Sequence, residues 1–125
     1  MALLALIKDN VAIAKFPLEQ GTFRIGRLPE NDLQIDDELV SAHHAVIEMQ
    51  RAPEGQGGYI YHIRDEDSTN STFVNGAPIS RAKLNHNDLI RIGLHSFKFF
   101  DDGTPEFEKT RRLKKSWIPG VFYTR

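Results

Sequence analysis

Cysteine is absent from the 125-residue sequence, which excludes disulfides, thiolate metal sites and cysteine nucleophiles. Long apolar runs are absent as well. No segment approaches the length of a membrane span, and the opening MALLALIKDN has an apolar run too short for a secretory signal. What is present, 40% hydrophobic and 26% charged residues, is typical of one globular domain. A cytosolic or nuclear setting is the default, and we expect a cytoplasmic protein without membrane contact or cofactors.

The net charge of −1 conceals an asymmetry between two parts of the chain. Residues 1–102 hold ten Lys/Arg against fifteen Asp/Glu, whereas residues 103–125 hold six against two. A duplex-binding domain would carry its basic stripe on the folded part, so nucleic acid is not an expected partner. We therefore divide the chain into an acidic folded domain, residues 1–102, and a basic tail, linker or short helix, residues 103–125.

Short apolar or alternating segments separated by turn residues predict an all-β sandwich. The expected strands cover residues 3–7, 11–16, 22–25, 33–35, 44–50, 59–64, 72–74, 77–79, 88–92 and 96–100. Asn75-Gly76 predicts a type I′ hairpin, because both central residues tolerate positive φ. Pro78 indicates that its strand is short or lies at a sheet edge.

Three polar clusters could form a binding or catalytic site if the loops at one end of the sandwich converge. They are Gly26-Arg27, the segment from Ser41 to His44, and the segment from Ser68 to Asn70. Arg27, which follows Gly26, offers a planar fork of donors suited to phosphate. Ser41 and Thr69 add hydroxyl groups, and the amide of Asn70 matches the main chain of an extended peptide. No cluster combines a nucleophile, a base and an orienting acid, so the set favours binding over reaction.

Taken singly, each cluster also has a structural explanation. Gly26-Arg27 could be a turn with a surface arginine, and Ser41 could cap a turn. His44 fits a buried histidine that braces neighbouring loops better than a ligand or a base. The run from Ser68 to Thr72 could satisfy its own backbone through Asx and ST turns.

Taken together, the segments FRIGR, SAHHAVI, DSTNSTFVNG and LNHNDLIRIG resemble, in order and spacing, the forkhead-associated (FHA) domain family. The resemblance covers roughly residues 1–102. It implies a β-sandwich of about eleven short strands that binds phosphothreonine-containing peptides or proteins through loops at one end. By position, Arg27 and Ser41 would contact the phosphate, Thr69 would lie beside it, and Asn70 would hold the peptide backbone.

The same resemblance assigns structural roles to four further positions: Gly26, His44, Asn75 and Gly76. Three departures from the family pattern stand beside them. Ala42 occupies a position that is often Arg or Asn and often contacts the ligand. Ser71 and Asn87 replace usual glycines, so Ser71 must fit a glycine turn or change it, while Asn tolerates the positive φ that glycine would adopt.

Rival hypotheses remain from other classes of function. A domain of the same fold could bind proteins through a sheet face, independently of phosphate. A hydrolase could use Ser41 as nucleophile and His44 as base, with Asp36 or Asp67 as the orienting acid. A metal site is not expected, because the adjacent side chains of His43 and His44 would point to opposite faces of a strand.

The basic tail suggests a last hypothesis. Thr104 and Thr110 lie in polar sequence that a kinase could reach. If either were phosphorylated and the tail could reach a set of binding loops, the effective concentration would be in the millimolar range. The domain could then close its own site or self-associate head to tail. An unmodified linker is the simpler interpretation.

Overall fold

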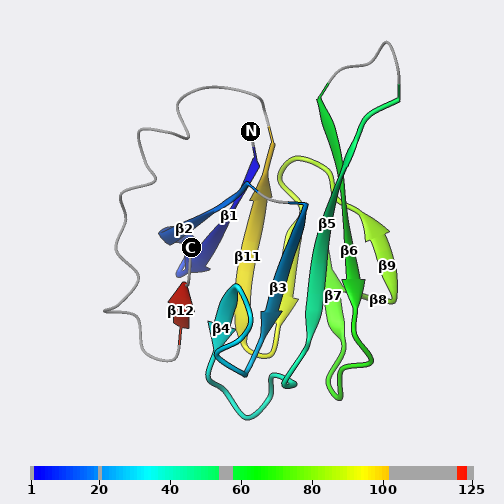
Figure 1. Ribbon diagram of the computed structural model, residues 1–125. Coiled ribbons are helices and arrows are strands. Elements are labelled where there is room, and N and C mark those ends of the chain that lie inside the picture. Colours follow the sequence, from blue (N-terminus) through cyan, green and yellow to red (C-terminus); the bar gives the residue numbers. More distant parts are fainter. Residues whose placement is uncertain (1, 20, 54–57, 102–120, 124–125) are drawn as a thin grey trace.

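The computed structural model describes residues 2–19, 21–53, 58–101 and 121–123. These residues form two six-stranded sheets packed face to face, with no helix in the described part of the chain (Figure 1). The all-β sandwich expected from the sequence is therefore confirmed. No helix long and apolar enough to cross a membrane occurs among these residues.

The first sheet has the strand order β2-β1-β11-β10-β7-β8. Its strands are β1 (Ala2–Lys8), β2 (Val11–Leu18), β7 (Thr72–Val74), β8 (Ala77–Ile79), β10 (Leu89–Ile92) and β11 (His95–Phe100). The second sheet has the order β12-β4-β3-β5-β6-β9. Its strands are β3 (Thr22–Gly26), β4 (Leu33–Ile35), β5 (Ala45–Arg51), β6 (Tyr59–Asp65), β9 (Arg81–Lys83) and β12 (Val121–Tyr123). Neighbouring strands in both sheets run antiparallel, except β3 and β4, which are parallel.

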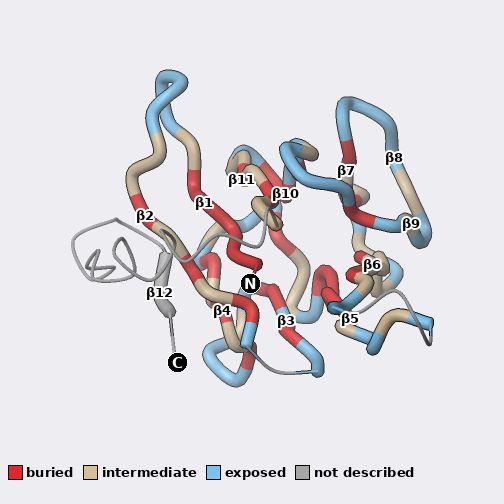
Figure 2. Tube along the Cα trace, turned by 90° about the horizontal axis from the view of Figure 1, so that it is seen from above, coloured by how far each residue is buried: buried red, intermediate tan, exposed pale blue. Residues whose placement is uncertain are grey.

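The core lies between the two sheets, where alternate residues of facing strands meet. In β5, Ala45 and Ile47 are buried in it and Met49 packs against it, as the alternation of this segment predicts. Aromatic rings from both sheets fill the centre, with Tyr61 and Phe99 5.3 Å apart between ring centroids. In the view from above, the buried stretches follow the strands and the hairpin tips are exposed (Figure 2).

The hairpin between β7 and β8 follows its sequence prediction. Asn75 and Gly76 have φ angles of 51° and 85°, and Val74 pairs with Ala77 across them, so the turn is of type I′. The Asn75 side chain also joins the hairpin to β10, because its Oδ1 accepts a hydrogen bond from the Leu89 amide at 2.9 Å. Pro78 lies on β8, at the edge of its sheet, as expected.

Two strands differ from the sequence-based expectation. β9 was not foreseen, because its residues Arg-Ala-Lys are largely exposed and show no apolar alternation; pairing with β6 at the sheet edge orders them. β12 falls in the segment expected to be a tail, linker or short helix, yet it pairs antiparallel with β4. The remainder of that segment from residue 103 to 120, with Thr104 and Thr110, lies outside the described residues.

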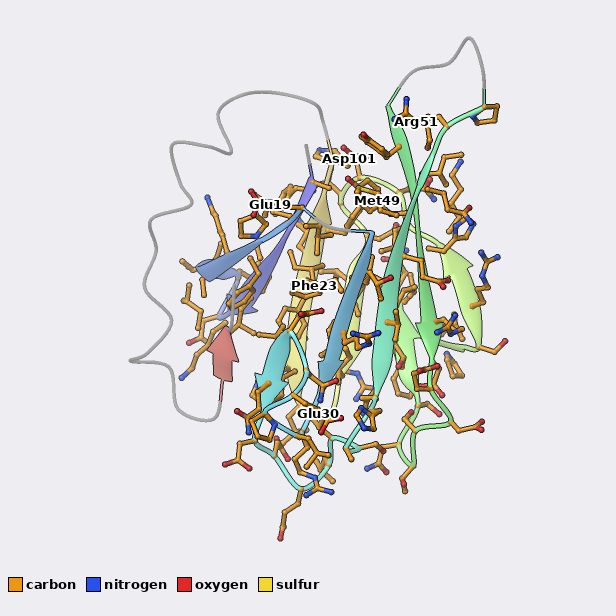
Figure 3. The ribbon with its side chains drawn as sticks, in the orientation of Figure 1. Glu19, Phe23, Glu30, Met49, Arg51 and Asp101 are labelled. Atoms are coloured by element: carbon orange, nitrogen blue, oxygen red, sulfur yellow. The ribbon has the colours of Figure 1, made fainter. Side chains whose placement is uncertain are left out.

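The connections β3–β4, β4–β5, β6–β7 and β10–β11 lie at one end of the sandwich (Figure 1). Figure 3 shows Glu30, in the β3–β4 connection, at this end, with Glu19, Met49, Arg51 and Asp101 at the opposite end. We call the first end the loop end. It carries all three polar clusters singled out in the sequence.

Candidate functional site

Arg27 follows β3 directly, and two contacts hold it against the β4–β5 loop. Its amide donates to the carbonyl of Ser41 at 2.9 Å, and its Nε donates to the carbonyl of Val40 at 3.0 Å. Gln34 of β4 donates to the Arg27 carbonyl at 3.0 Å. The side chain is exposed, and among the described residues its two terminal nitrogens have no hydrogen-bond partner. The Nε contact thus holds the guanidinium and leaves its two terminal nitrogens available as donors.

Ser41 and Thr69 are 28 residues apart in sequence but are hydrogen-bonded in the fold. The hydroxyl oxygen of Ser41 accepts the amide proton of Thr69 at 3.0 Å, which leaves the hydroxyl proton able to donate elsewhere. The neighbouring Asn70 donates from Nδ2 to the carbonyl of Leu39 at 3.0 Å. Thr69 and Asn70 are both exposed. The β6–β7 loop is therefore joined to the β4–β5 loop at two points, and the four predicted contact residues share one surface.

His44 lies beneath this surface and is fully buried. Its Nδ1 accepts the amide proton of Ser41 at 3.0 Å, so Nδ1 cannot carry a proton of its own. The proton of the neutral ring must then be on Nε2, which donates to the carbonyl of Ser71 at 2.9 Å. One imidazole ring thereby connects the β4–β5 loop to the β6–β7 loop. Neither of its nitrogens is available to activate the hydroxyl of Ser41.

Gly26 occupies a position where any side chain would collide with its surroundings. A Cβ atom there would overlap the carbonyl oxygen of Ala42 and lie 2.7 Å from Nδ2 of Asn31. The absence of a side chain at Gly26 leaves room for the side chain of Asn31, which is only 2% exposed. Asn31 donates to the carbonyls of Leu28 and Ala42 at 2.9 and 2.8 Å. Asn31 was missed in the sequence; an asparagine in the polar turn Pro-Glu-Asn-Asp gives no sign that it will be buried.

Asp65, at the end of β6, is a second residue that the sequence interpretation missed. Its carboxylate accepts hydrogen bonds from the hydroxyls of Ser68 and Thr72 and from the amide of Ser68. Burial alone would raise the pKa of this carboxyl, but the hydrogen bonds from Ser68 and Thr72 outweigh burial and lower the pKa below its usual value. The Asp-x-x-Ser spacing, which lets a carboxylate accept hydrogen bonds from the residue three positions on, was the available signal.

The family departures at Ser71 and Asn87 are accommodated by the backbone. Both residues have positive φ, 67° and 77° respectively, the region that glycine occupies without cost. The expectation that Asn87 would take this conformation is confirmed. Ser71 keeps the glycine turn rather than changing it, and its carbonyl is the acceptor of the His44 hydrogen bond.

A depression of about 310 Å³ opens beside this surface. It is lined by Arg24, Glu30, Asn31, His43, Ala45, Val46 and Glu66, and so by none of the four predicted contact residues. His43 and Glu30 pair across it, with 3.2 Å between Nε2 and the carboxylate. The exposed loop surface and this depression are distinct features.

The fold and the loop end define a β-sandwich that presents a prearranged set of hydrogen-bond donors on convergent loops. A family model described as "FHA domain" matches residues 23–93, more than half of the chain. The chain belongs to the FHA domain family, which confirms the resemblance inferred from its motifs.

Curated relatives come mainly from mycobacteria and corynebacteria. The chain is 40% identical to an ABC transporter ATP-binding/permease protein of Mycobacterium tuberculosis over 67% of this chain and 9% of the relative. It is 34% identical to the glycogen accumulation regulator GarA of Mycolicibacterium smegmatis over 74% of this chain and 54% of the relative. The chain thus spans about half or less of these two relatives.

Solved structures agree on the fold. Mycobacterium tuberculosis EmbR, in complex with a low-affinity phosphopeptide, matches with a TM-score of 0.68 and 38% identity over 82% of this chain and 25% of that one. A structure from an analysis of phosphothreonine-dependent FHA domain interactions matches with a TM-score of 0.67 and 28% identity, over 82% and 98%.

Proposed function

We propose that this domain is an interaction module that binds phosphothreonine-containing segments of partner proteins. The observation that carries the proposal is the common placement of Arg27, Ser41, Thr69 and Asn70 on one exposed surface, fixed by hydrogen bonds between loops. Membership of the FHA family and the similarity to EmbR, which was solved with a phosphopeptide, support it.

Each of the four residues has a distinct part in the proposed complex. Arg27 supplies a charge-assisted, two-pronged contact to the phosphate, and the Ser41 hydroxyl donates a further hydrogen bond. Thr69 lies beside the phosphate, and Asn70 holds the peptide main chain. The cytoplasmic setting remains a prediction from composition.

The enzyme alternative does not fit the geometry. A nucleophilic Ser41 would need a basic nitrogen at its hydroxyl, but both nitrogens of His44 are used by backbone groups of Ser41 and Ser71. The hydroxyl oxygen instead accepts the amide proton of Thr69. We therefore propose binding without turnover.

The first test measures affinity for a phosphothreonine peptide library, with unphosphorylated and phosphoserine versions of each selected peptide. The Arg27→Ala variant should lose about 2–4 kcal/mol of binding free energy, roughly 30-fold or more in affinity, because it removes one member of a charge-assisted pair. Arg51→Ala is the matched control: it removes the same charge from an exposed residue at the opposite end of the sandwich (Figure 3).

The outcomes separate the hypotheses. Unchanged affinity in a folded Arg27→Ala variant would show that the site is misplaced. Equal affinity for phosphorylated and unphosphorylated peptides would favour the phosphate-independent interaction domain instead.

A further inference from the structure

The strands of the first sheet carry positive charge and no negative charge. Together β1, β2, β7, β8, β10 and β11 contain four Lys/Arg and neither Asp nor Glu. Residues 1–102 as a whole hold fifteen Asp/Glu against ten Lys/Arg. The charge of this sheet is therefore opposite in sign to that of the domain that contains it.

Three of the four cations point away from the core. Each lies between two core residues of its own strand: Lys15 in β2, Arg91 in β10 and Lys98 in β11. Because side chains alternate along a strand, these three are on the outer face of the sheet. All described strands belong to the two sheets, so no third layer of described strands covers that face (Figure 2).

Two of the cations lie in one row across the sheet. Lys98 pairs with Leu89 on one side and with Ala5 on the other, and Ala5 in turn pairs with Lys15. The row crosses four strands, about 14 Å at the usual spacing of neighbouring strands. Leu89 is 46% exposed, so an apolar side chain is accessible beside the two lysines.

The next row adds the third cation and an aromatic ring. Arg91 pairs with Phe73, and its guanidinium carbon lies 4.1 Å from the centroid of that ring. Its Nη1 also donates to the Gly93 carbonyl at 3.4 Å. These contacts hold the guanidinium against the sheet and leave other N–H groups available as donors. We call this set of residues the basic face: Lys15, Phe73, Leu89, Arg91 and Lys98.

The cations of the basic face have no acidic partner. Among the described residues, none of Lys15, Arg91 and Lys98 forms an ion pair. The outer face of the second sheet carries both signs of charge, since Arg64 is held there by Glu48 at 2.9 Å and by Glu66 at 3.1 Å. Like charges gathered without counter-charges repel one another. Folding therefore gives no reason for the cluster, whereas an acidic partner does.

The basic face suits a protein segment better than a membrane or a nucleic acid. Membrane surfaces are bound through large apolar side chains that project, but Leu89 is the only exposed one in this set, and Phe73 is half-buried. Domains that bind nucleic acid typically make about six to ten phosphate contacts, more than three cations provide. A short acidic segment matches both the charge and the size of the face.

We propose that the basic face is a second interaction surface, which binds an acidic segment of a partner protein without requiring phosphorylation. Carboxylates of the segment pair with Lys15, Arg91 and Lys98. An aliphatic or aromatic residue between the carboxylates packs on Leu89 and Phe73. An extended segment of about five residues spans the 14 Å row. The phosphothreonine site proposed above is on loops and this surface is on a sheet face, so either can be occupied without the other.

The test uses unphosphorylated peptides of about ten residues on a Gly/Ser background, in which two Glu residues flank a Leu at several spacings. Binding at low salt is measured by titration and located by NMR chemical-shift changes. The perturbed amide signals should belong to β1, β10 and β11. Replacing both Glu residues of the peptide by Gln should weaken binding about tenfold, and added salt should weaken it as well.

Charge reversal then assigns the binding to residues. Lys98→Glu and Arg91→Glu should each weaken binding of the acidic peptide about tenfold and favour the peptide in which Lys replaces Glu. Lys83→Glu is the matched control, because it reverses the same charge at an exposed residue of β9, in the other sheet. Its affinity for the acidic peptide should equal that of the wild-type domain. Thermal unfolding establishes that each variant is folded.

Three results overturn the proposal: no acidic peptide binds, the signals that move lie outside the basic face, or Lys83→Glu loses as much affinity as the other two variants. Binding of phosphatidylserine vesicles or of an oligonucleotide duplex through Arg91 and Lys98, with no peptide bound, also overturns it by assigning another class of partner. None of these measurements uses a phosphothreonine peptide, so failure of this inference and failure of the proposed function are distinguishable.

Discussion

Replacement of His44 by alanine is the most informative test of how the loop end is held together. The change leaves two backbone groups without their partner, the amide of Ser41 and the carbonyl of Ser71. Each unsatisfied buried group costs about 1–3 kcal/mol, and the loss of a fully buried ring adds a cavity. Because water can reach loops near the surface, we expect a net loss of about 3–5 kcal/mol in the free energy of unfolding.

The assay is thermal unfolding, followed by peptide affinity measured well below the lowered midpoint. For a domain of this size, the expected destabilisation corresponds to a fall in Tm of roughly 10–20 °C. Affinity should fall only because the two loops are no longer held together. His43→Ala is the matched control. The side chain of His43 is 51% exposed and, among the described residues, pairs only with exposed Glu30. The Tm of this variant should therefore change by no more than about 2 °C.

Two results would refute this reasoning. An unchanged Tm with lost affinity would place His44 in the binding surface instead of beneath it. Nitrogen chemical shifts that show the proton on Nδ1 of the ring would contradict the hydrogen bond from Ser41.

Two other predictions test the site more briefly. Gly26→Ala should lower Tm by several degrees or prevent folding, because the added methyl group displaces Asn31 from the Ala42 carbonyl; a normal melting curve would contradict the close packing. Peptide affinity should fall as pH drops through about 6, where phosphothreonine loses a negative charge, and should fall with added salt. The contribution of Asp65 to stability should persist through that range, because its lowered pKa gives stability that is complete above the ordinary value of 3.8 and is lost only at still lower pH. Affinity that is flat in pH and salt would argue against phosphate recognition.

Local features of the fold could be read from the sequence because they depend on neighbours in the chain. Asn75-Gly76 defines its hairpin through backbone preferences alone, and the alternation of β5 follows from one buried face. Edge strands are different. The residues of β9 and β12 become strands because β6 and β4 present unpaired backbone groups, which no window of sequence reveals.

The candidate site likewise contains residues that could be identified from the sequence and residues that could not. Arg27, Ser41, Thr69 and Asn70 could be singled out because their side chains have chemistry that suits a phosphopeptide and their motifs resemble a family. The residues that hold them, Asn31 and Asp65, were not found. Their roles depend on contacts across loops, such as the hydrogen bonds from Asn31 to the Ala42 carbonyl and from Thr72 to Asp65.

The hydrogen bonds at the loop end explain how a small polar surface could bind with useful affinity. A ligand that must order flexible loops loses binding free energy to that ordering. Here the hydroxyl of Ser41 is already held by the Thr69 amide, and the side chains of Arg27 and Asn70 are already held by carbonyls of the β4–β5 loop. Each contact uses one hydrogen-bonding group and leaves others available: the Ser41 hydroxyl proton, the Arg27 terminal nitrogens and the second amide proton and the oxygen of Asn70. The internal network and the proposed ligand contacts can therefore exist together, so phosphopeptide binding should add hydrogen bonds to this surface without breaking those that shape it.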